Sequence, residues 1–190
     1  MAEALSPLKT KCIRGRHNEA GEAGIVISSR SVNGLWQIAG WDNFEDVAGN
    51  VLRSFGIDSV GNYRNVQSAD GVTAWRIAPD KTLLEGVDNL SAWGSAELAV
   101  LDLSHARAVI KLSGSFARDL LAQLVAVDTT CSRFGPDEFL QTIIDHVGVL
   151  IQCKDHDCFE IFVPSTWAET IWDVIFKNAL PYGIEIKEPV

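Results

Sequence analysis

The sequence predicts an α+β fold with mainly antiparallel sheets, built from a duplicated strand-helix-strand unit. Strand-like runs alternate with a few helices, one strand-turn-helix pattern occurs twice, and each of its helices carries an apolar stripe. The 190 residues, 47% of them hydrophobic, suit one well-cored domain. We therefore expect a single domain over residues 1–190, with an irregular arm over about 1–23 and repeats over about 24–95 and 96–190.

The first unit begins with a short strand at residues 35–38. This strand ends at Gly40, and Asp42 or Asn43 is placed to cap the helix that follows. Gly56 suits the end of that helix. The predicted stripe of the helix consists of Phe44, Val47, Ala48, Val51, Leu52 and Phe55.

The second unit begins at residues 109–112 and ends its strand at Gly114, with Ser115 as the expected cap. The predicted stripe consists of Phe116, Leu120, Leu121, Leu124 and Val127. Placing Gly40 on Gly114 without gaps aligns Val47 with Leu121, Ala48 with Ala122 and Val51 with Val125. This agreement indicates an internal duplication.

Further strands and one more helix follow the two units. The first helix precedes strands at 72–77 and 81–85, joined by a Pro79-Asp80 turn. The second precedes strands at 139–144, 147–152 and 159–163, with turns at 145–146 and 154–157. A third helix is expected over 166–179, capped by Thr166 or Ser165, with Trp167, Ile171, Trp172 and Ile175 buried, and a last strand over 184–186.

The charge and the apolar pattern exclude several classes of protein. A net charge of -9 disfavours nucleic acid as a partner, because such binding depends on cationic side chains. The first 17 residues are basic through Lys9, Lys11, Arg14, Arg16 and His17. They form either an arm that lies on an acidic surface or, as we prefer, a frayed terminus. Without a predicted signal segment or membrane span, the expected location is the cytoplasm, with the four cysteines reduced.

Few residues qualify as catalytic or metal-binding. The cluster Cys153, His156 and Cys158 could supply zinc ligands, but a hairpin flanked by two buried thiols explains it better, since no second ligand pair has matching spacing. Asp102, Ser104 and His105 provide the residue types of a triad. Neighbours in sequence rarely converge in space, so we interpret them as a turn.

No glycine-rich phosphate loop is present, and no carboxylate pair stands out as a general acid and base. We therefore expect no catalytic residue and no metal site, and we assign no cofactor-binding residue. Trp36, Trp75 and Trp167 are expected in the core. The loop residues Trp41 and Trp93 either tuck under their own loops or anchor a partner.

Four motifs resemble the gamma subunit of heterotetrameric sarcosine oxidases. They lie at residues 75–84, 101–107, 109–118 and 158–168, in the order and spacing of that family. The resemblance covers about residues 70–180, and the N-terminal third is only loosely similar.

The resemblance implies the fold of the folate-binding domain of the glycine-cleavage T-protein. It also implies alpha, beta and delta partner subunits, which would hold FAD, FMN, NAD and tetrahydrofolate. The complex would demethylate sarcosine oxidatively to glycine, and this chain would be a non-catalytic assembly subunit. The equivalent subunit of another N-methyl amino acid oxidase or dehydrogenase would be very similar. Two competing hypotheses are a stand-alone folate- or pterin-binding protein of the same fold, and an enzyme that uses the His105 or Cys158 region.

Overall fold

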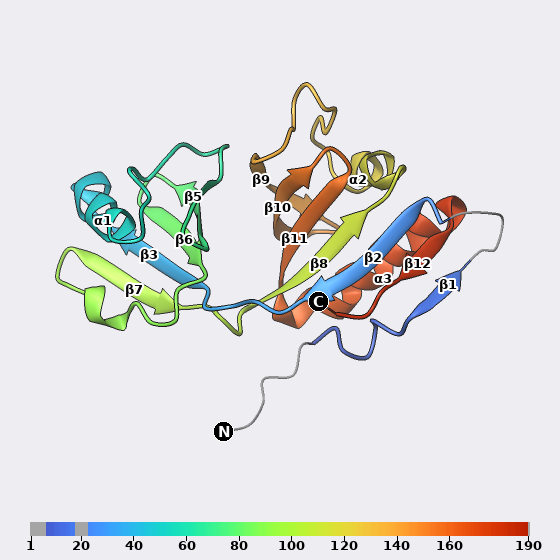
Figure 1. Cartoon of the computed structure of the whole chain (residues 1–190), viewed down its shortest axis with the longest axis horizontal. Helices are drawn as coiled ribbons and strands as arrows, with labels where there is room; N and C mark the ends of the chain where they lie inside the picture. Colours follow the sequence, from blue (N-terminus) through green and yellow to red (C-terminus); the bar gives the residue numbers. More distant parts are fainter. Residues whose placement is uncertain (1–6, 18–22, 190) are drawn as a thin grey trace. The chain divides into compact units, whose positions relative to one another are not determined.

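The computed structural model describes residues 7–17 and 23–189, and the chain divides into two units (Figure 1). Unit 2 is the continuous segment Val32–His105, and unit 1 joins the residues before it to those after it. Each unit has its own sheet and its own apolar core. The α+β class with mainly antiparallel sheets is confirmed.

Unit 2 contains a five-stranded antiparallel sheet in the order β4-β5-β6-β3-β7. Its strands are β3 (Trp36–Gly40), β4 (Gln67–Ala69), β5 (Val72–Ala78), β6 (Lys81–Glu85) and β7 (Leu98–Asp102). The helix α1 (Phe44–Arg53) follows β3, and the short 3-10 helix η1 (Ser91–Trp93) precedes β7.

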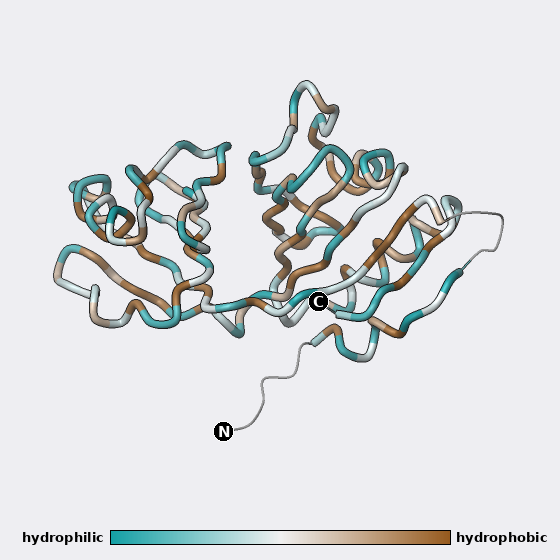
Figure 2. The backbone as a smooth tube through the Cα atoms, in the orientation of Figure 1, coloured by the Kyte–Doolittle hydropathy of each residue, from teal (hydrophilic) through white to brown (hydrophobic). Residues whose placement is uncertain are grey.

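The core of unit 2 lies between α1 and one face of its sheet. Strand alternation sends Trp36 and Ile38 of β3 to this face, where they meet the α1 residues Phe44, Ala48 and Leu52. The 3.6-residue period of the helix and the two-residue period of the strand thus converge on one apolar layer. Figure 2 shows the apolar stretches of the backbone along the strands.

Unit 1 contains a seven-stranded sheet in the order β1-β12-β2-β8-β11-β10-β9, antiparallel except for the β12–β2 pair. Its strands are β1 (Gly15–His17), β2 (Ile25–Arg30), β8 (Arg107–Ser113), β9 (Phe139–Ile144), β10 (Val147–Asp155), β11 (Cys158–Pro164) and β12 (Ile184–Ile186). Its helices are α2 (Ala117–Leu124) and α3 (Ala168–Ala179), with short 3-10 turns η2 (Ser165–Trp167) and η3 (Leu180–Tyr182).

The two sheets repeat one topology, which bears out the predicted duplication. The order β4-β5-β6-β3-β7 of unit 2 corresponds strand by strand to β9-β10-β11-β8-β2 of unit 1. The register agrees as well. Gly40 N donates to Asp80 O at 3.0 Å, and Gly114 N donates to Asp157 O at 3.2 Å. Gly40 and Gly114 are therefore equivalent, as the sequence alignment predicts.

The first strand of each repeat is exchanged. β2 precedes β3 in the chain but pairs with β8, and β7 precedes β8 but pairs with β3. For this reason the units differ from the consecutive segments 24–95 and 96–190 expected from the sequence. Neither β2 nor β7 is predicted as a strand, so the sequence pattern does not reveal the exchange.

The gap-free alignment of the two helices is wrong by one residue. Asn43 is the N-cap position of α1 and Phe116 that of α2, so one extra residue separates Gly40 from its helix. Ala48 then aligns with the buried Leu121, not with the exposed Ala122. Burial, not identity, determines the correct offset.

The expected side-chain caps do not form. Asn43 occupies the N-cap of α1 without a capping hydrogen bond, and Ser115 lies one residue before the N-cap of α2. The 3-10 turn η2 absorbs Ser165 and Thr166, so α3 begins only at Ala168. Acidic residues in the first turn of each helix complement its dipole instead.

Several local predictions also change. Trp36 and Trp75 are buried as expected, but Trp167 is 50% exposed because η2 turns it away from the stripe of α3. Phe116 is 43% exposed and stacks on Tyr182. The hairpin tip expected at 154–157 is tighter, since β10 continues to Asp155.

The basic arm is ordered over residues 7–17. Lys11 Nζ lies 2.7 Å from Asp173 Oδ1 on α3, Leu8 is fully buried, and β1 pairs with β12. The preference for a frayed terminus is therefore wrong for this part, which lies against acidic Asp173. Residues 1–6 and 18–22 lie outside the described residues.

Candidate functional site

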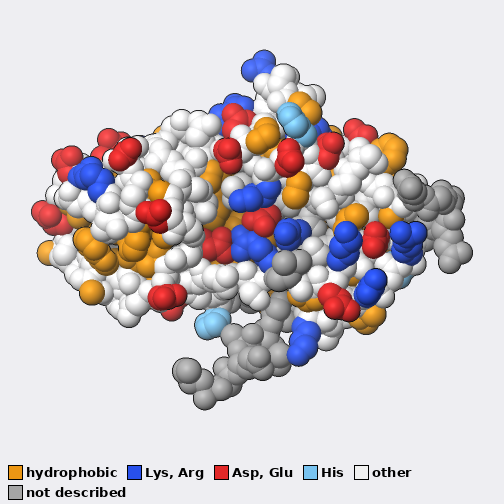
Figure 3. Space-filling model, in the orientation of Figure 1, with side chains coloured by type: hydrophobic (Ala, Val, Ile, Leu, Met, Phe, Trp, Pro, Cys, Tyr) orange, Lys and Arg blue, Asp and Glu red, His pale blue; other side chains and the backbone are white. Residues whose placement is uncertain are grey.

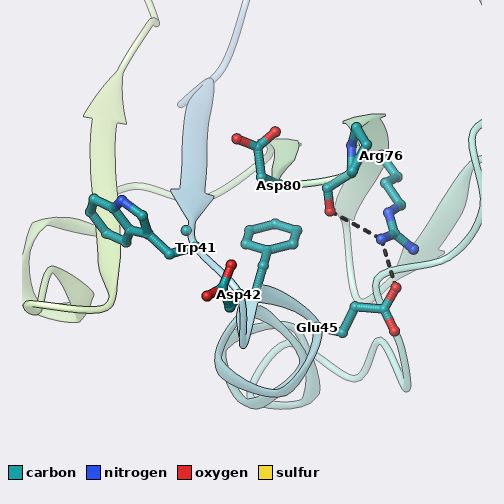
Figure 4. A pocket seen from close by; sticks show the side chains of 8 residues that line it. Trp41, Asp42, Glu45, Arg76 and Asp80 are labelled. Carbon is teal, nitrogen blue, oxygen red and sulfur yellow. Dashed lines mark hydrogen bonds and ion pairs between the residues drawn. The ribbon is translucent and has the colours of Figure 1, made fainter.

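The end of β3 in unit 2 opens into a surface pocket of about 550 Å³ (Figure 4). Trp41 and Asp42 line it from the β3–α1 connection, Glu45 from α1, and Arg76 and Asp80 from the β5–β6 hairpin. Figure 4 shows Arg76 and Glu45 together on one side and Trp41 on the other, with Asp42 and Asp80 between them.

Arg76 is the structural anchor of this pocket. Its side chain is only 11% exposed, and Nη2 lies 2.6 Å from Glu45 Oε1. Nη2 also donates to Pro79 O at 3.0 Å, and Nη1 donates to Gly61 O at 3.2 Å. The guanidinium lies 4.9 Å from the centre of the Tyr63 ring. Arg76 therefore ties the α1–β4 connection to the β5–β6 turn.

Unit 1 has the same anchor with the residues exchanged. Arg118, the second residue of α2, takes the position of Glu45, the second residue of α1. Its Nε donates to His156 O at 3.0 Å in the β10–β11 turn, and its Nη1 donates to Phe134 O at 2.9 Å in the α2–β9 connection. Its Nη2 lies 3.8 Å from Cys153 Sγ.

Cys153 occupies the strand position that Arg76 has in unit 2. Each residue lies on the first strand of its hairpin, and in both hairpins the pairing register shifts between this residue and the residue two positions later. Each unit thus has one guanidinium between helix and hairpin, supplied by the strand in unit 2 and by the helix in unit 1. Sequence reasoning missed this exchange, although a one-residue gap after Gly40 would have aligned Glu45 with Arg118.

The pocket in unit 2 carries three carboxylates and one arginine that is already paired. Its unpaired acidic groups and the exposed Trp41 ring suit a cationic or hydrogen-bond-donating group. No serine, cysteine or histidine lines it. Of its three carboxylates, Asp42 and Glu45 are exposed and Asp80 is half-buried.

Asp102, Ser104 and His105 form a turn and not a triad. Ser104 Oγ donates to Asp102 Oδ1 at 2.6 Å, and Ser104 N donates to the same oxygen at 2.9 Å. These bonds lower the pKa of Asp102 below its ordinary value. Because Ser104 donates to the carboxylate and not to His105, the hydroxyl is not activated as a nucleophile. β8 begins shortly afterwards, as predicted.

The cysteine hairpin contains a buried thiol and a half-buried one. Cys153 is fully buried, and Cys158 is half-buried, so the expectation of two buried thiols holds for the first alone. Burial raises the pKa of both thiols, which keeps them protonated at neutral pH. Among residues 7–17 and 23–189, no three His, Cys, Asp or Glu side chains gather in a way that could hold a metal ion.

The loop tryptophans are exposed. Trp41 is 61% exposed and Trp93 is 40% exposed, both in unit 2. Figure 3 shows hydrophobic side chains gathered over the region of α1 and β7 in this unit. Neither tryptophan is therefore buried under its own loop, which was one of the two alternatives expected from the sequence.

The fold corresponds to that of a sarcosine oxidase chain. A chain of heterotetrameric sarcosine oxidase from Corynebacterium sp. U-96, in complex with pyrrole 2-carboxylate, matches with a TM-score of 0.78 at 19% identity. The match covers 94% of this chain and 95% of that one. The two chains share one fold. The fold implied by the four sequence motifs is thereby confirmed over 94% of the chain.

A second match supports the relation to the T-protein. Aminomethyltransferase T of the glycine cleavage system from Bartonella henselae matches with a TM-score of 0.58 at 15% identity. This match covers 86% of the present chain and 48% of the T-protein chain. No protein-family profile matches the sequence, and no curated protein does.

In the described part of the chain, no helix is long and apolar enough to cross a lipid bilayer.

Proposed function

We propose that this chain is the gamma-type assembly subunit of a heterotetrameric sarcosine oxidase. One observation supports this most strongly: the match to a chain of such an enzyme runs over 94% of this chain and 95% of the other. The T-protein match, by contrast, covers under half of that longer chain. A subunit that corresponds from end to end is more informative than one domain of a larger enzyme.

The chemistry of the described residues supports an accessory role. Ser104 and Asp102 satisfy each other in a turn, Cys153 lies in the core, and the pocket at β3 has no nucleophile. Catalysis would then belong to the alpha, beta and delta partners, together with FAD, FMN, NAD and tetrahydrofolate. The complex would oxidise sarcosine, or another N-methyl amino acid, in the cytoplasm.

Exposed aromatic side chains provide the means of assembly. Trp and Tyr are enriched at the centres of protein interfaces. Unit 2 exposes Trp41, Tyr63 and Trp93 outside its buried apolar core. Burying the exposed apolar surface of these side chains against a partner would favour the complex by about 25 cal/mol per Å².

Two parallel measurements test the proposal. The tagged chain is co-expressed with the alpha, beta and delta subunits of a heterotetrameric sarcosine oxidase, and co-purification is measured. The isolated chain is also titrated with tetrahydrofolate by calorimetry. We expect a stable complex and no heat of binding. A monodisperse chain that binds tetrahydrofolate and ignores the other subunits would contradict the proposal and support a stand-alone folate-binding protein.

A further inference from the structure

The strand β7 is an unprotected edge of the unit 2 sheet (Figure 1). It has β3 on one side and, within residues 7–17 and 23–189, no strand on the other. Its sequence, Leu-Ala-Val-Leu-Asp, contains neither lysine nor proline, the residues that commonly protect sheet edges. Leu101 is 53% exposed. Such an edge is suited to strand addition by another polypeptide.

The alternation of hydrogen bonds along β7 identifies which backbone groups point away from β3. Leu103 N donates to Leu35 O at 2.8 Å, in register with the β3–β7 ladder. Since hydrogen-bonded pairs alternate in an antiparallel ladder, Ala99 and Leu101 bond to β3, and Val100 does not. The N–H and C=O of Val100 therefore point away from β3.

Unit 1 shows what occupies this edge in the other repeat. Matching Gly40 with Gly114 places Leu98 on Ile25 and Val100 on Ile27 of β2. There β12 pairs with β2 in parallel, with Ile186 opposite Ile27. Lys187 N donates to Ile27 O at 2.9 Å. The carbonyl equivalent to that of Val100 thus bonds to an added strand.

Within the described chain, hydrogen bonds to the outer edge of β7 are made only at its first residue, Leu98. Ser95 N donates to Leu98 O at 2.9 Å, and Leu98 N donates to Ser95 Oγ at 3.2 Å. These bonds replace the one that Ile25 N makes to Gly183 O at 3.1 Å in unit 1. Beyond Leu98 no segment of the described chain continues the cover as a strand, so the open stretch runs from Val100 to Asp102.

We propose that this edge, Val100 to Asp102, receives an extended segment of a large partner subunit, running parallel to β7 as β12 runs beside β2. The identity of the partner rests on the proposed function. The segment alternates apolar and polar residues, as Ile184, Glu185 and Ile186 do. A basic residue at its end would suit the carboxylate of Asp102, in the way that Lys187 follows Ile186.

The test uses proline to remove one outward N–H. Val100→Pro deletes the open donor without removing a bond to β3, since proline is tolerated on the free side of edge strands. The matched control is Ile143→Pro on β9, the edge strand of unit 1. Cys153 N donates to Glu138 O at 2.9 Å, so the same alternation directs the N–H of Ile143 outward, and its side chain is 59% exposed.

We expect Val100→Pro to weaken binding to the co-expressed alpha, beta and delta subunits at least tenfold, and Ile143→Pro to leave it unchanged. Leu101→Lys, which keeps every backbone group, should weaken binding severalfold. In the wild-type complex, hydrogen exchange at the Val100 amide should slow at least tenfold relative to the isolated chain. This measurement decides the question even if Val100→Pro does not fold.

Two results would overturn the inference in different ways. The added strand would be refuted if the Val100 amide exchanged in the wild-type complex at the same rate as in the isolated chain. It would also be refuted if a folded Val100→Pro variant bound the other subunits with unchanged affinity. Either result would leave the proposed function intact. A wild-type chain that binds none of the subunits would overturn both.

Discussion

Replacing Arg76 with methionine should destabilise unit 2 because Arg76 anchors backbone, not because it forms an ion pair. Its two hydrogen bonds to the carbonyls of Gly61 and Pro79 come from a charged, largely buried donor. Such bonds contribute about 1.5–3 kcal/mol each. The pair with Glu45 adds little, since Glu45 is 68% exposed and exposed pairs contribute less than about 1 kcal/mol.

We therefore expect Arg76→Met to lower the free energy of unfolding by about 3–6 kcal/mol, and Glu45→Gln by less than about 1 kcal/mol. With a slope of about 2 kcal/mol per molar urea, the midpoint of Arg76→Met falls by about 1.5–3 M. The assay is urea unfolding followed by tryptophan fluorescence and circular dichroism. Equal losses for the two variants would refute the anchoring argument, and so would a loss below about 0.5 kcal/mol for Arg76→Met.

Two further predictions concern local geometry. Gly114→Ala should destabilise unit 1 by several kcal/mol in thermal unfolding, because φ is 120° and a Cβ would lie 2.4 Å from Gly24 O, whereas Gly148→Ala, with nothing within 4 Å, should be near neutral. Equal melting temperatures for the two variants would contradict this. Ser104→Ala should return the pKa of Asp102 toward its ordinary value in a carbon-13 NMR titration. Because the folded-state pKa is lowered, the stability from this contact is present above the unfolded-state pKa of about 3.9 and lost as the pH falls through the folded value; an unchanged titration would disprove the role of Ser104.

The strands and helices with strong patterns could be predicted from the sequence. β9, β6 and β12 have the predicted limits, and β5 differs by one residue. Their apolar runs end at clear turn residues such as Pro79-Asp80, so local chemistry determines the boundaries. The duplication was visible for the same reason, because each repeat keeps its glycine after the strand.

The exchange of β2 and β7 could not be predicted. Which strand lies beside which is determined by backbone pairing between segments far apart in the chain, and residue periodicity does not encode it. The anchors are similar in this respect. Arg76 and Arg118 have no common sequence position, since one comes from a strand and the other from a helix. Their similar role becomes visible only in the structure, where each arginine donates hydrogen bonds to the helix-strand connection and to the hairpin turn of its own unit.

The candidate site was predicted only in part. Trp41 is a loop residue in the sequence pattern and in the structure, although its exposure was left open, and Asp102-Ser104 is a turn in both. The pocket itself combines residues from two separate segments of unit 2, residues 40–45 and 76–80, which no local motif brings together.

The most direct test of the central claim is native mass spectrometry of a sarcosine oxidase complex prepared without its gamma subunit and then mixed with this purified chain. We expect one copy of the chain to join the alpha, beta and delta subunits. An incomplete complex that gains no mass on mixing would contradict it, and so would a chain that oxidised sarcosine without the other subunits.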